Sequence, residues 1–387
     1  MHKRAIVPII LWLLVSGLLF SAHAWASCSA PGNSIEAENC LAGTPKSTWD
    51  IAGSGDATIQ GFADNISVNV GQTINFKINT PANAYHLDIY RMGYYQSNGA
   101  RLVTTIQPSV TLPQAQPNCI ANPGAGLYDC GNWDVSASWT VPADATSGIY
   151  FARVIRDDTL GASHIVFIVR NDASHSHILF QASDTTWQAY NDSVNGQNLY
   201  TNNTCGQWVA SCRSYKVSYN RPFNTRVFES ASWVFNAEYP MVRWLEANGY
   251  DVTYFTDTDT DRNGSLILNH KMWMSNGHDE YWSGQQRANI EAARNAGIHL
   301  AFFSGNTLFW KTRWENSVVD GSPYRTLACY KETYLDVKDP LDPPIWTGTW
   351  STADFSNANF RVRLIDVAAS TARDFSLDGV AVQVTYQ

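Results

Sequence analysis

The sequence has 387 residues, of which 44% are hydrophobic and 16% are charged, so the chain is long enough to bury a large core and too apolar to be disordered. Its 26 Lys and Arg residues against 34 Asp and Glu residues give a net charge of −8, which argues against nucleic acid as a partner. Aromatic residues are frequent, with 15 Trp, 18 Tyr and 16 Phe, and this composition favours sheets over long exposed helices.

The first 26 residues have the pattern of a secretory signal peptide. A basic start, Met1-His2-Lys3-Arg4, is followed by the apolar run from Ala5 to Phe20 and by the small-x-small ending Ala24-Trp25-Ala26. We therefore predict that residues 1–26 are removed and that the mature protein is secreted or periplasmic. An uncleaved membrane anchor is the alternative. No later stretch is apolar enough to span a bilayer, so we expect no membrane span after cleavage.

Six of the seven cysteines fall in close pairs. The pairs are Cys28/Cys40, Cys119/Cys130 and Cys205/Cys212, and Cys329 is left over. In an exported chain this spacing predicts three short-loop disulfides. Zinc binding is the alternative, but no pair has Cys-x-x-Cys spacing.

Residues 27–172 are predicted to form an antiparallel, Ig-like β-sandwich. Short runs in which apolar and polar residues alternate are separated by Gly, Pro, Asn and Asp, and we expect no helix between them. The segment 139–153 indicates a strand, a turn and a second strand. The other predicted strands are residues 65–70, 73–78, 86–90 and 164–169.

Residues 173–340 show a different pattern, with apolar strands that alternate with helices. A helix is predicted over Glu238–Asn248, and a second begins at Ser283, which forms a capping box with Gln286 and is followed by Gly297 as the stop. This alternation predicts an open α/β domain with a mainly parallel sheet and helices on both faces. The predicted strands are residues 177–182, 251–256, 271–275 and 298–303.

Residues 341–387 are predicted to be a C-terminal extension. They are rich in Pro, Trp and Thr at first and then form short strand-like runs. These runs stop abruptly at Gln387, which suggests a truncated domain.

Polar residues that could carry chemistry follow three of the strands predicted in the α/β half. Ligands bind beyond the carboxyl ends of the strands in an open α/β sheet, so these residues should meet at one edge. His278 and Glu280 are two residues apart and would point to the same side of an extended chain. The set resembles a metal site, and its members are Tyr190, Tyr200, His278, Glu280 and Asn306.

Each of these residues also has a purely structural interpretation. His278 could be a hydrogen-bonded loop histidine, and Glu280 could pair with Arg287 or Lys311. The two tyrosines could be core or rim residues, and Asn306 could be a turn residue.

Several other chemistries are excluded or disfavoured. The turn Gly277-His278-Asp279 has no cysteine at the place of an amidotransferase nucleophile, and Ser275 lacks a Gly-x-Ser-x-Gly frame. The Pro-Cys-x-x-Cys motif of zinc deaminases is absent from the sequence. Asp259–Gly264 matches the opening of an EF-hand, but position twelve is His270, so we predict an acidic loop between strands.

The motifs around these residues resemble the large (beta) subunit family of N,N-dimethylformamidase. The resemblance implies a glutamine-amidotransferase-like α/β domain without the cysteine nucleophile. It also implies a mononuclear iron held by two tyrosines and a glutamate. The motifs are Leu268-Asn269-His270-Lys271 through Gly277-His278-Asp279-Glu280-Tyr281-Trp282-Ser283, Ala301-Phe302-Phe303-Ser304-Gly305-Asn306, Trp187-Gln188-Ala189-Tyr190-Asn191 and Ser218-Tyr219-Asn220-Arg221-Pro222.

The resemblance also assigns roles to individual residues. Tyr190, Tyr200 and Glu280 match the iron ligands of the family. The loop between the two tyrosines is shorter here, so the match of Tyr200 depends on the Leu-Tyr motif alone. His278 and Asn306 match residues that act beside the iron, and Glu332 is the candidate for a further family glutamate.

The resulting expectation is an exported, iron-dependent hydrolase of amide or formamide bonds that acts on a small amide-containing substrate. Two phenolates and a carboxylate favour a hard ferric ion, which polarises a carbonyl and activates a bound water. One alternative is a non-catalytic surface or carbohydrate-binding protein, and another is a hydrolase of glycan or cell-wall amides. The oligomeric state stays open, a homo-oligomer included.

Overall fold

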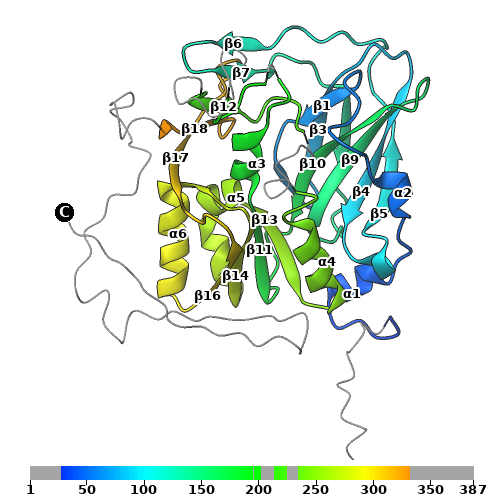
Figure 1. Cartoon of the computed structure of the whole chain (residues 1–387). Helices are drawn as coiled ribbons and strands as arrows, with labels where there is room; N and C mark the ends of the chain where they lie inside the picture. Colours follow the sequence, from blue (N-terminus) through cyan, green and yellow to red (C-terminus); the bar gives the residue numbers. More distant parts are fainter. Residues whose placement is uncertain (1–27, 195, 202–212, 225–233, 332–387) are drawn as a thin grey trace, which may run out of the picture. The chain divides into compact units, whose positions relative to one another are not determined.

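The computed structural model describes residues 28–194, 196–201, 213–224 and 234–331 (Figure 1). It is a mixed fold in which strands predominate over helices and are spread over several sheets. Four predictions lie outside the described residues: the signal peptide at 1–26, the Cys205/Cys212 pair, the role of Glu332, and the extension at 341–387.

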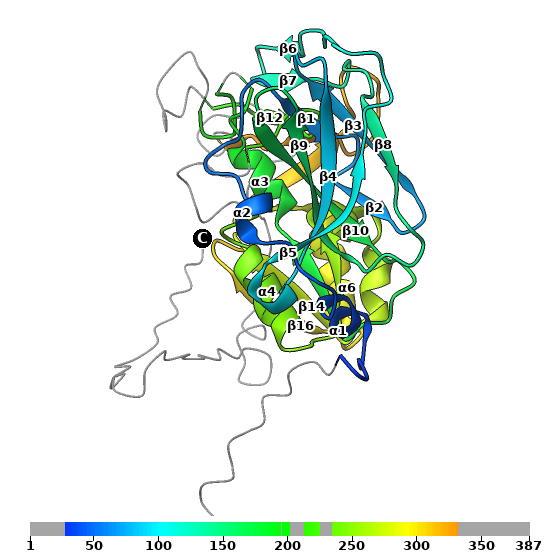
Figure 2. The same ribbon diagram turned by 90° about the vertical axis from the view of Figure 1, so that its right-hand side faces the viewer.

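Two sheets built from the first half of the chain pack around a common core (Figure 2). Neighbouring strands are antiparallel, except that β2 pairs with β10 in parallel. Ile74, Phe76 and Ile78 of β3 are fully buried against Leu87 and Ile89 of β4, as the period of two predicts. The five-stranded sheet has the order β2 (Ser67–Asn69), β10 (Ala162–Arg170), β9 (Gly148–Arg156), β4 (Tyr85–Met92), β5 (Ala100–Ile106), and the three-stranded sheet has the order β1 (Gln60–Ala63), β3 (Thr73–Asn79), β8 (Ala137–Thr140).

Short helices precede and interrupt these strands, contrary to the expectation of an unbroken β region. They are α1 (Ser34–Asn39), α2 (Lys46–Trp49) and the 3-10 helix η2 (Tyr95–Ser97).

The second half contains a four-stranded, entirely parallel sheet, as predicted. Its order is β13 (Val252–Thr256), β11 (Ile178–Ala182), β14 (Met272–Gly277), β16 (His299–Ser304). The accompanying helices are α3 (Asp184–Tyr190), α4 (Tyr239–Ala247), α5 (Asp257–Arg262) and α6 (Gly284–Asn295), with the 3-10 helix η5 (Gly264–Asn269) after α5.

The helix boundaries follow the capping signals in the sequence. Ser283 and Gln286 form the predicted capping box at the start of α6. Gly249, two residues after α4 ends, has φ of +68°, and Gly297, two residues after α6, has φ of +95°, the left-handed conformation that glycine adopts without strain. Both helix predictions are therefore confirmed.

Helices cover both faces of the parallel sheet. Ile178 and Phe180 of β11 pack with Val242 of α4, whereas Leu179, between them, packs with Ile290 of α6 on the opposite face. Figure 1 accordingly shows α4 and α6 on opposite sides of β11 and β14.

The face toward α4 also packs against the first half of the chain. Phe151 of β9 and Val166 of β10 belong to the same buried cluster as Phe180 of β11. One continuous core thus joins the two halves, and all described residues fall in one compact unit.

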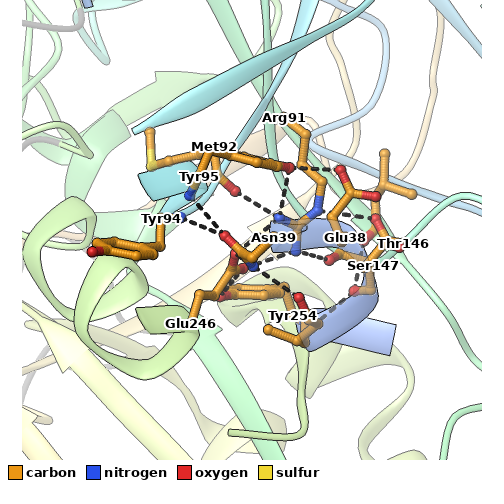
Figure 3. Close-up of polar contacts among 12 residues, drawn as sticks. Glu38, Asn39, Arg91, Met92, Tyr94, Tyr95, Thr146, Ser147, Glu246 and Tyr254 are labelled. Carbon is orange, nitrogen blue, oxygen red and sulfur yellow. Dashed lines mark hydrogen bonds and ion pairs between the residues drawn. The ribbon is translucent and has the colours of Figure 1, made fainter. Parts of the chain in front are cut away.

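A buried polar network reinforces this junction (Figure 3). Arg91 of β4 and Glu246 of α4 are both 0% exposed and form an ion pair with nitrogen–oxygen distances of 2.8 and 3.0 Å. Tyr254 of β13 donates a hydrogen bond to Glu246, and Asn39 of α1 donates another, each at 2.8 Å. Three distant parts of the chain therefore meet at one carboxylate.

A second mixed sheet was not predicted. It has the order β12 (Lys216–Ser218), β18 (Thr326–Ala328), β17 (Trp310–Glu315), β15 (Tyr281–Ser283). β15 and β17 are parallel, and the other two pairings are antiparallel. A two-stranded sheet of β6 (Ile120–Asn122) and β7 (Leu127–Asp129) completes the described strands.

The acidic segment at residues 259–264 is mostly a helix, so the prediction of an inter-strand loop was wrong. Thr256 and Asp259 form a capping box that starts α5. Asp259 is fully buried and lies 3.1 Å from Arg170 and 2.8 Å from Arg262. Its carboxylate is therefore used for helix capping and ion pairing.

Two of the predicted disulfides are present, Cys28–Cys40 and Cys119–Cys130, and Cys329 is a buried free cysteine. The two disulfides are consistent with an extracellular or periplasmic protein. Among the described residues, no helix has the length and apolar character needed to cross a membrane.

Candidate functional site

Three of the predicted site residues converge beyond the carboxyl edge of the parallel sheet. The Tyr190 hydroxyl donates to Glu280 Oε2 at 2.9 Å. The Tyr200 hydroxyl lies 3.0 Å from Glu280 Oε1 and 3.1 Å from Oε2. The two tyrosine rings stack with their centroids 4.3 Å apart. Two phenol oxygens and a carboxylate thus form one compact group.

Local structure brings each of these residues to the edge. Tyr190 is the last residue of α3, which begins directly after β11. Glu280 follows β14, and its backbone N–H donates to Thr186 Oγ1 of α3 at 3.0 Å. Tyr200 comes from the segment 196–201, in which the Leu199 N–H donates to the Ala189 carbonyl at 2.9 Å. The ends of two neighbouring parallel strands therefore account for the arrangement.

His278 reaches the same carboxylate. Its Nε2 lies 3.4 Å from Glu280 Oε2, and 19% of its side chain is exposed. The ring packs closely over Gly305, where a Cβ atom would lie 3.1 Å from Nδ1. His278 is thus held at the rim, with access both to the buried carboxylate and to solvent.

One structural interpretation placed Glu280 in an ion pair with Arg287, and the structure does not show this pair. Arg287 instead pairs with Glu291 on α6 at 2.8 Å. Asp279, beside Glu280, accepts hydrogen bonds from Gln181 and Trp282 in the core. Of the two neighbouring carboxylates, only that of Glu280 contacts the two tyrosines.

Asn306 is not brought into this group. Its side chain is exposed, its φ is +48°, and its carbonyl accepts from the Phe309 N–H. Among the described residues, its side chain forms no hydrogen bond with the tyrosines or Glu280. Its expected contact with substrate stays a prediction, as does the role of Glu332.

Two further residues at the site were missed from the sequence. The Lys331 ammonium donates a hydrogen bond to the Tyr281 hydroxyl, which in turn donates to the Tyr200 hydroxyl. Lys331 Nζ also lies 3.1 Å from the centroid of the Tyr200 ring, and only 2% of Lys331 is exposed. Lys331 follows the unpredicted strand β18, so no pattern pointed to it. Tyr281 lay inside the recognised motif but without an assigned role.

The surroundings keep Glu280 ionised and Tyr200 protonated. Burial raises the pKa of Glu280, but the hydrogen bond from His278 and the positive charge of Lys331 outweigh it, so the pKa is lowered overall. Burial, followed by the negative charge of Glu280, raises the pKa of Tyr200 well above its ordinary value. A cation among these oxygens would supply the charge that favours phenolate.

The oxygen set has the composition and spacing of a cation site. Oxygen ligands at right angles about 2 Å from a metal ion lie about 2.8 Å apart, close to the 2.9 to 3.1 Å separations between the tyrosine and Glu280 oxygens. In the part of the chain that the structure describes, no group of three or more His, Cys, Asp or Glu side chains is arranged to hold a metal. The two tyrosines and Glu280 stay the candidate metal centre because of their hard oxygen donors.

The protein therefore has a mixed fold of sheets and helices. Its candidate site lies at the carboxyl edge of the parallel sheet. Comparison with protein families identifies it further. The family model described as N,N-dimethylformamidase beta subunit-like, C-terminal, matches residues 86–363. The chain belongs to this family, as its motifs predicted. A search of curated proteins found no match.

Proposed function

We propose that the protein is an exported, iron-dependent hydrolase of carbon–nitrogen bonds in amides or formamides. Membership of the N,N-dimethylformamidase beta subunit-like family supports an amide hydrolase. The observation that carries the proposal is the convergence of the Tyr190 and Tyr200 hydroxyls on Glu280. The two disulfides support export.

Tyr190, Tyr200 and Glu280 would hold a single iron ion, and their hard oxygen donors favour the ferric state. When bound, the ion would polarise the substrate carbonyl and lower the pKa of a bound water. Tyr281 and Lys331 would hold the Tyr200 oxygen in place through their chain of hydrogen bonds.

His278 would move the proton that hydrolysis requires. Water forms the new carbon–oxygen bond and loses a proton, and the departing nitrogen gains one as the carbon–nitrogen bond breaks. His278 would accept the first and donate the second, since its Nε2 lies at the rim 3.4 Å from Glu280. Asn306 would bind the substrate or the developing oxyanion, which requires its side chain to turn toward Glu280.

We infer an Ig-like sandwich and a glutamine-amidotransferase-like α/β domain as the two parts of the fold. The sheet order β13-β11-β14-β16 supports the second part. Gly277, with φ of +83°, begins a sharp turn after β14, where the nucleophile of an amidotransferase would stand. His278 and Asp279 follow instead of a cysteine, in line with a reaction that has no covalent intermediate.

A carbohydrate-binding protein is the second candidate because exposed aromatic side chains lie near the site. The side chains of Phe302, Phe303 and Phe309 are each more than half exposed. Phe309 lies close to Glu280 in space, because the backbone N–H of the next residue, Trp310, donates to the Glu280 carbonyl at 2.9 Å. Such rings are suited to stack on sugars.

Amine release from simple amides by the iron-loaded protein tests the proposal. N,N-dimethylformamide, formamide and short N-acyl amines are the substrates. We expect turnover that falls by about 10²-fold or more in His278→Asn. The matched control is His86→Asn, since His86 also lies beside a carboxylate, 2.7 Å from Asp157, but on the sandwich. Absence of turnover together with binding to a glycan array would overturn the hydrolase in favour of the binding protein.

A further inference from the structure

Arg221 lies in the segment after β12 and is fully enclosed by the protein, with 2% of its surface exposed. All three nitrogens of its guanidinium donate to backbone carbonyls. Nε donates to Ser218 at 2.9 Å, Nη1 to Gln197 at 2.7 Å, and Nη2 to Gln188 at 2.8 Å. Among the described residues, no carboxylate forms an ion pair with it.

Two of the three carbonyls that Arg221 binds belong to the segments that carry the site tyrosines. Gln188 lies on α3, two residues before Tyr190, and Gln197 lies three residues before Tyr200. One rigid, planar group therefore spans both segments at fixed distances.

Burial of this arginine is unfavourable by itself, and the negative charge of Asp192 offsets only part of the cost. Burial lowers the pKa of Arg221 to about 10, as expected for a poorly solvated cation. The three hydrogen bonds from this charged donor to backbone carbonyls stabilise the buried guanidinium.

Asn198 also joins the same two segments. Its side-chain amide donates to the Tyr190 carbonyl at 3.2 Å, and its side-chain oxygen accepts from the Tyr200 N–H at 2.7 Å. The backbones of both tyrosines are thus linked, and Arg221 fixes the segments that lead into them.

We propose that Arg221 is the positioning residue that sets the spacing of the Tyr190 and Tyr200 hydroxyls over Glu280. The proposal deepens the proposed function and depends on it only for the ion that the tyrosines hold. Arg221 touches neither hydroxyl and acts through the backbone of both segments.

Arg325 is the matched control. It lines the same small cavity as Arg221, is 4% exposed, and has its pKa lowered by burial to about 10 as well. Its hydrogen bonds go to Asn220, Ala63 and Tyr219, and none goes to the segments of the two tyrosines. Replacement of either arginine removes a buried cation, but only that of Arg221 frees the tyrosine segments.

The test compares the wild type with Arg221→Gln, Arg221→Lys and Arg325→Gln, each examined as metal-free crystals and by ferric-ion titration. In Arg221→Gln we expect at least one tyrosine hydroxyl to leave hydrogen-bond distance of Glu280 and iron binding to weaken by about 10 to 100-fold. Arg325→Gln should keep both hydroxyls on Glu280 and bind iron within about threefold of the wild type. Arg221→Lys keeps the positive charge but can donate to fewer of the three carbonyls, so its iron affinity should lie between those of the wild type and Arg221→Gln.

The proposal is overturned if Arg221→Gln keeps both hydroxyls on Glu280, or if Arg325→Gln displaces them equally. If Arg221→Gln does not fold, Arg221→Lys decides by the same two criteria. A wild type that binds no iron would contradict the proposed function, while the metal-free crystals would still decide the role of Arg221.

Discussion

The Tyr200 hydroxyl lies 3.0 Å from Glu280 Oε1, although 80 residues separate the two in the chain. Glu280 is held by β14 and α3, and Tyr200 is held by its link to the end of α3. The contact therefore depends on the carboxyl edge of the parallel sheet, where β11 and β14 end side by side.

Lys331 is predicted to keep the Glu280 carboxylate ionised. In Lys331→Met, the lost positive charge should raise the pKa of Glu280, since that charge now lowers it. Carbon-13 NMR titration of the side-chain carboxyl in the metal-free protein measures the shift. Lys216→Met, which removes the ion pair between Lys216 of β12 and Glu315 of β17 in the small mixed sheet, should leave the pKa of Glu280 unchanged. An unchanged Glu280 pKa in Lys331→Met would contradict this assignment.

The buried Arg91–Glu246 pair should be costly to break. Glu246→Gln leaves the Arg91 charge fully buried, so we expect a loss of about 3 to 5 kcal/mol in the free energy of unfolding. The matched control is Glu291→Gln, which breaks an exposed pair with Arg287 and should cost less than about 1 kcal/mol. Urea denaturation measures both, and equal effects would show that the junction gains nothing from the network.

Glu238 should make the protein less stable at alkaline pH. Burial raises the pKa of this carboxyl to about 8, and no described residue hydrogen-bonds to its Oε2. The pKa of Glu238 in the folded state exceeds the ordinary value of 4.5, so the protonated carboxyl stabilises the folded state. This stabilisation is fully present below pH 4.5 and is lost as the pH rises through about 8.

Glu238→Gln should remove part of this pH dependence. Glutamine keeps the oxygen that accepts from Ser183 N and Trp187 Nε1 and carries no charge to bury. The variant should therefore gain stability relative to the wild type between pH 5 and pH 9, by roughly 1 to 4 kcal/mol in urea denaturation. Parallel stability curves for the two proteins would rule out Glu238 as the source.

Local signals in the sequence were sufficient for the large elements. The capping box of Ser283 and the glycines after α4 and α6 predicted where these helices begin and end. The acidic helix α5 was missed because its aspartates suggested a loop, although Thr256 and Asp259 formed a second capping box. A capping signal is thus more informative here than the charge of the segment.

The small mixed sheet could not be predicted, because its strands are short and come from distant parts of the chain. Three of its four strands have only three residues each, namely β12, β15 and β18. Lys331 and Tyr281 owe their positions to this sheet, so no sequence pattern linked them to Tyr200. Tyr190 and Glu280, in contrast, follow strands of the parallel sheet, so their place at its carboxyl edge could be predicted, while their roles came from the family resemblance.

Iron content and the visible spectrum of the reconstituted protein test the central claim most directly. We predict close to one iron per chain and a tyrosinate-to-iron charge-transfer band, both lost in Tyr190→Phe and Glu280→Ala. Tyr128→Phe, a change on β7 that touches none of the three proposed ligands in the described contacts, should keep both. A folded wild type that binds no iron, or a band that survives in Tyr190→Phe and Glu280→Ala, would contradict the account.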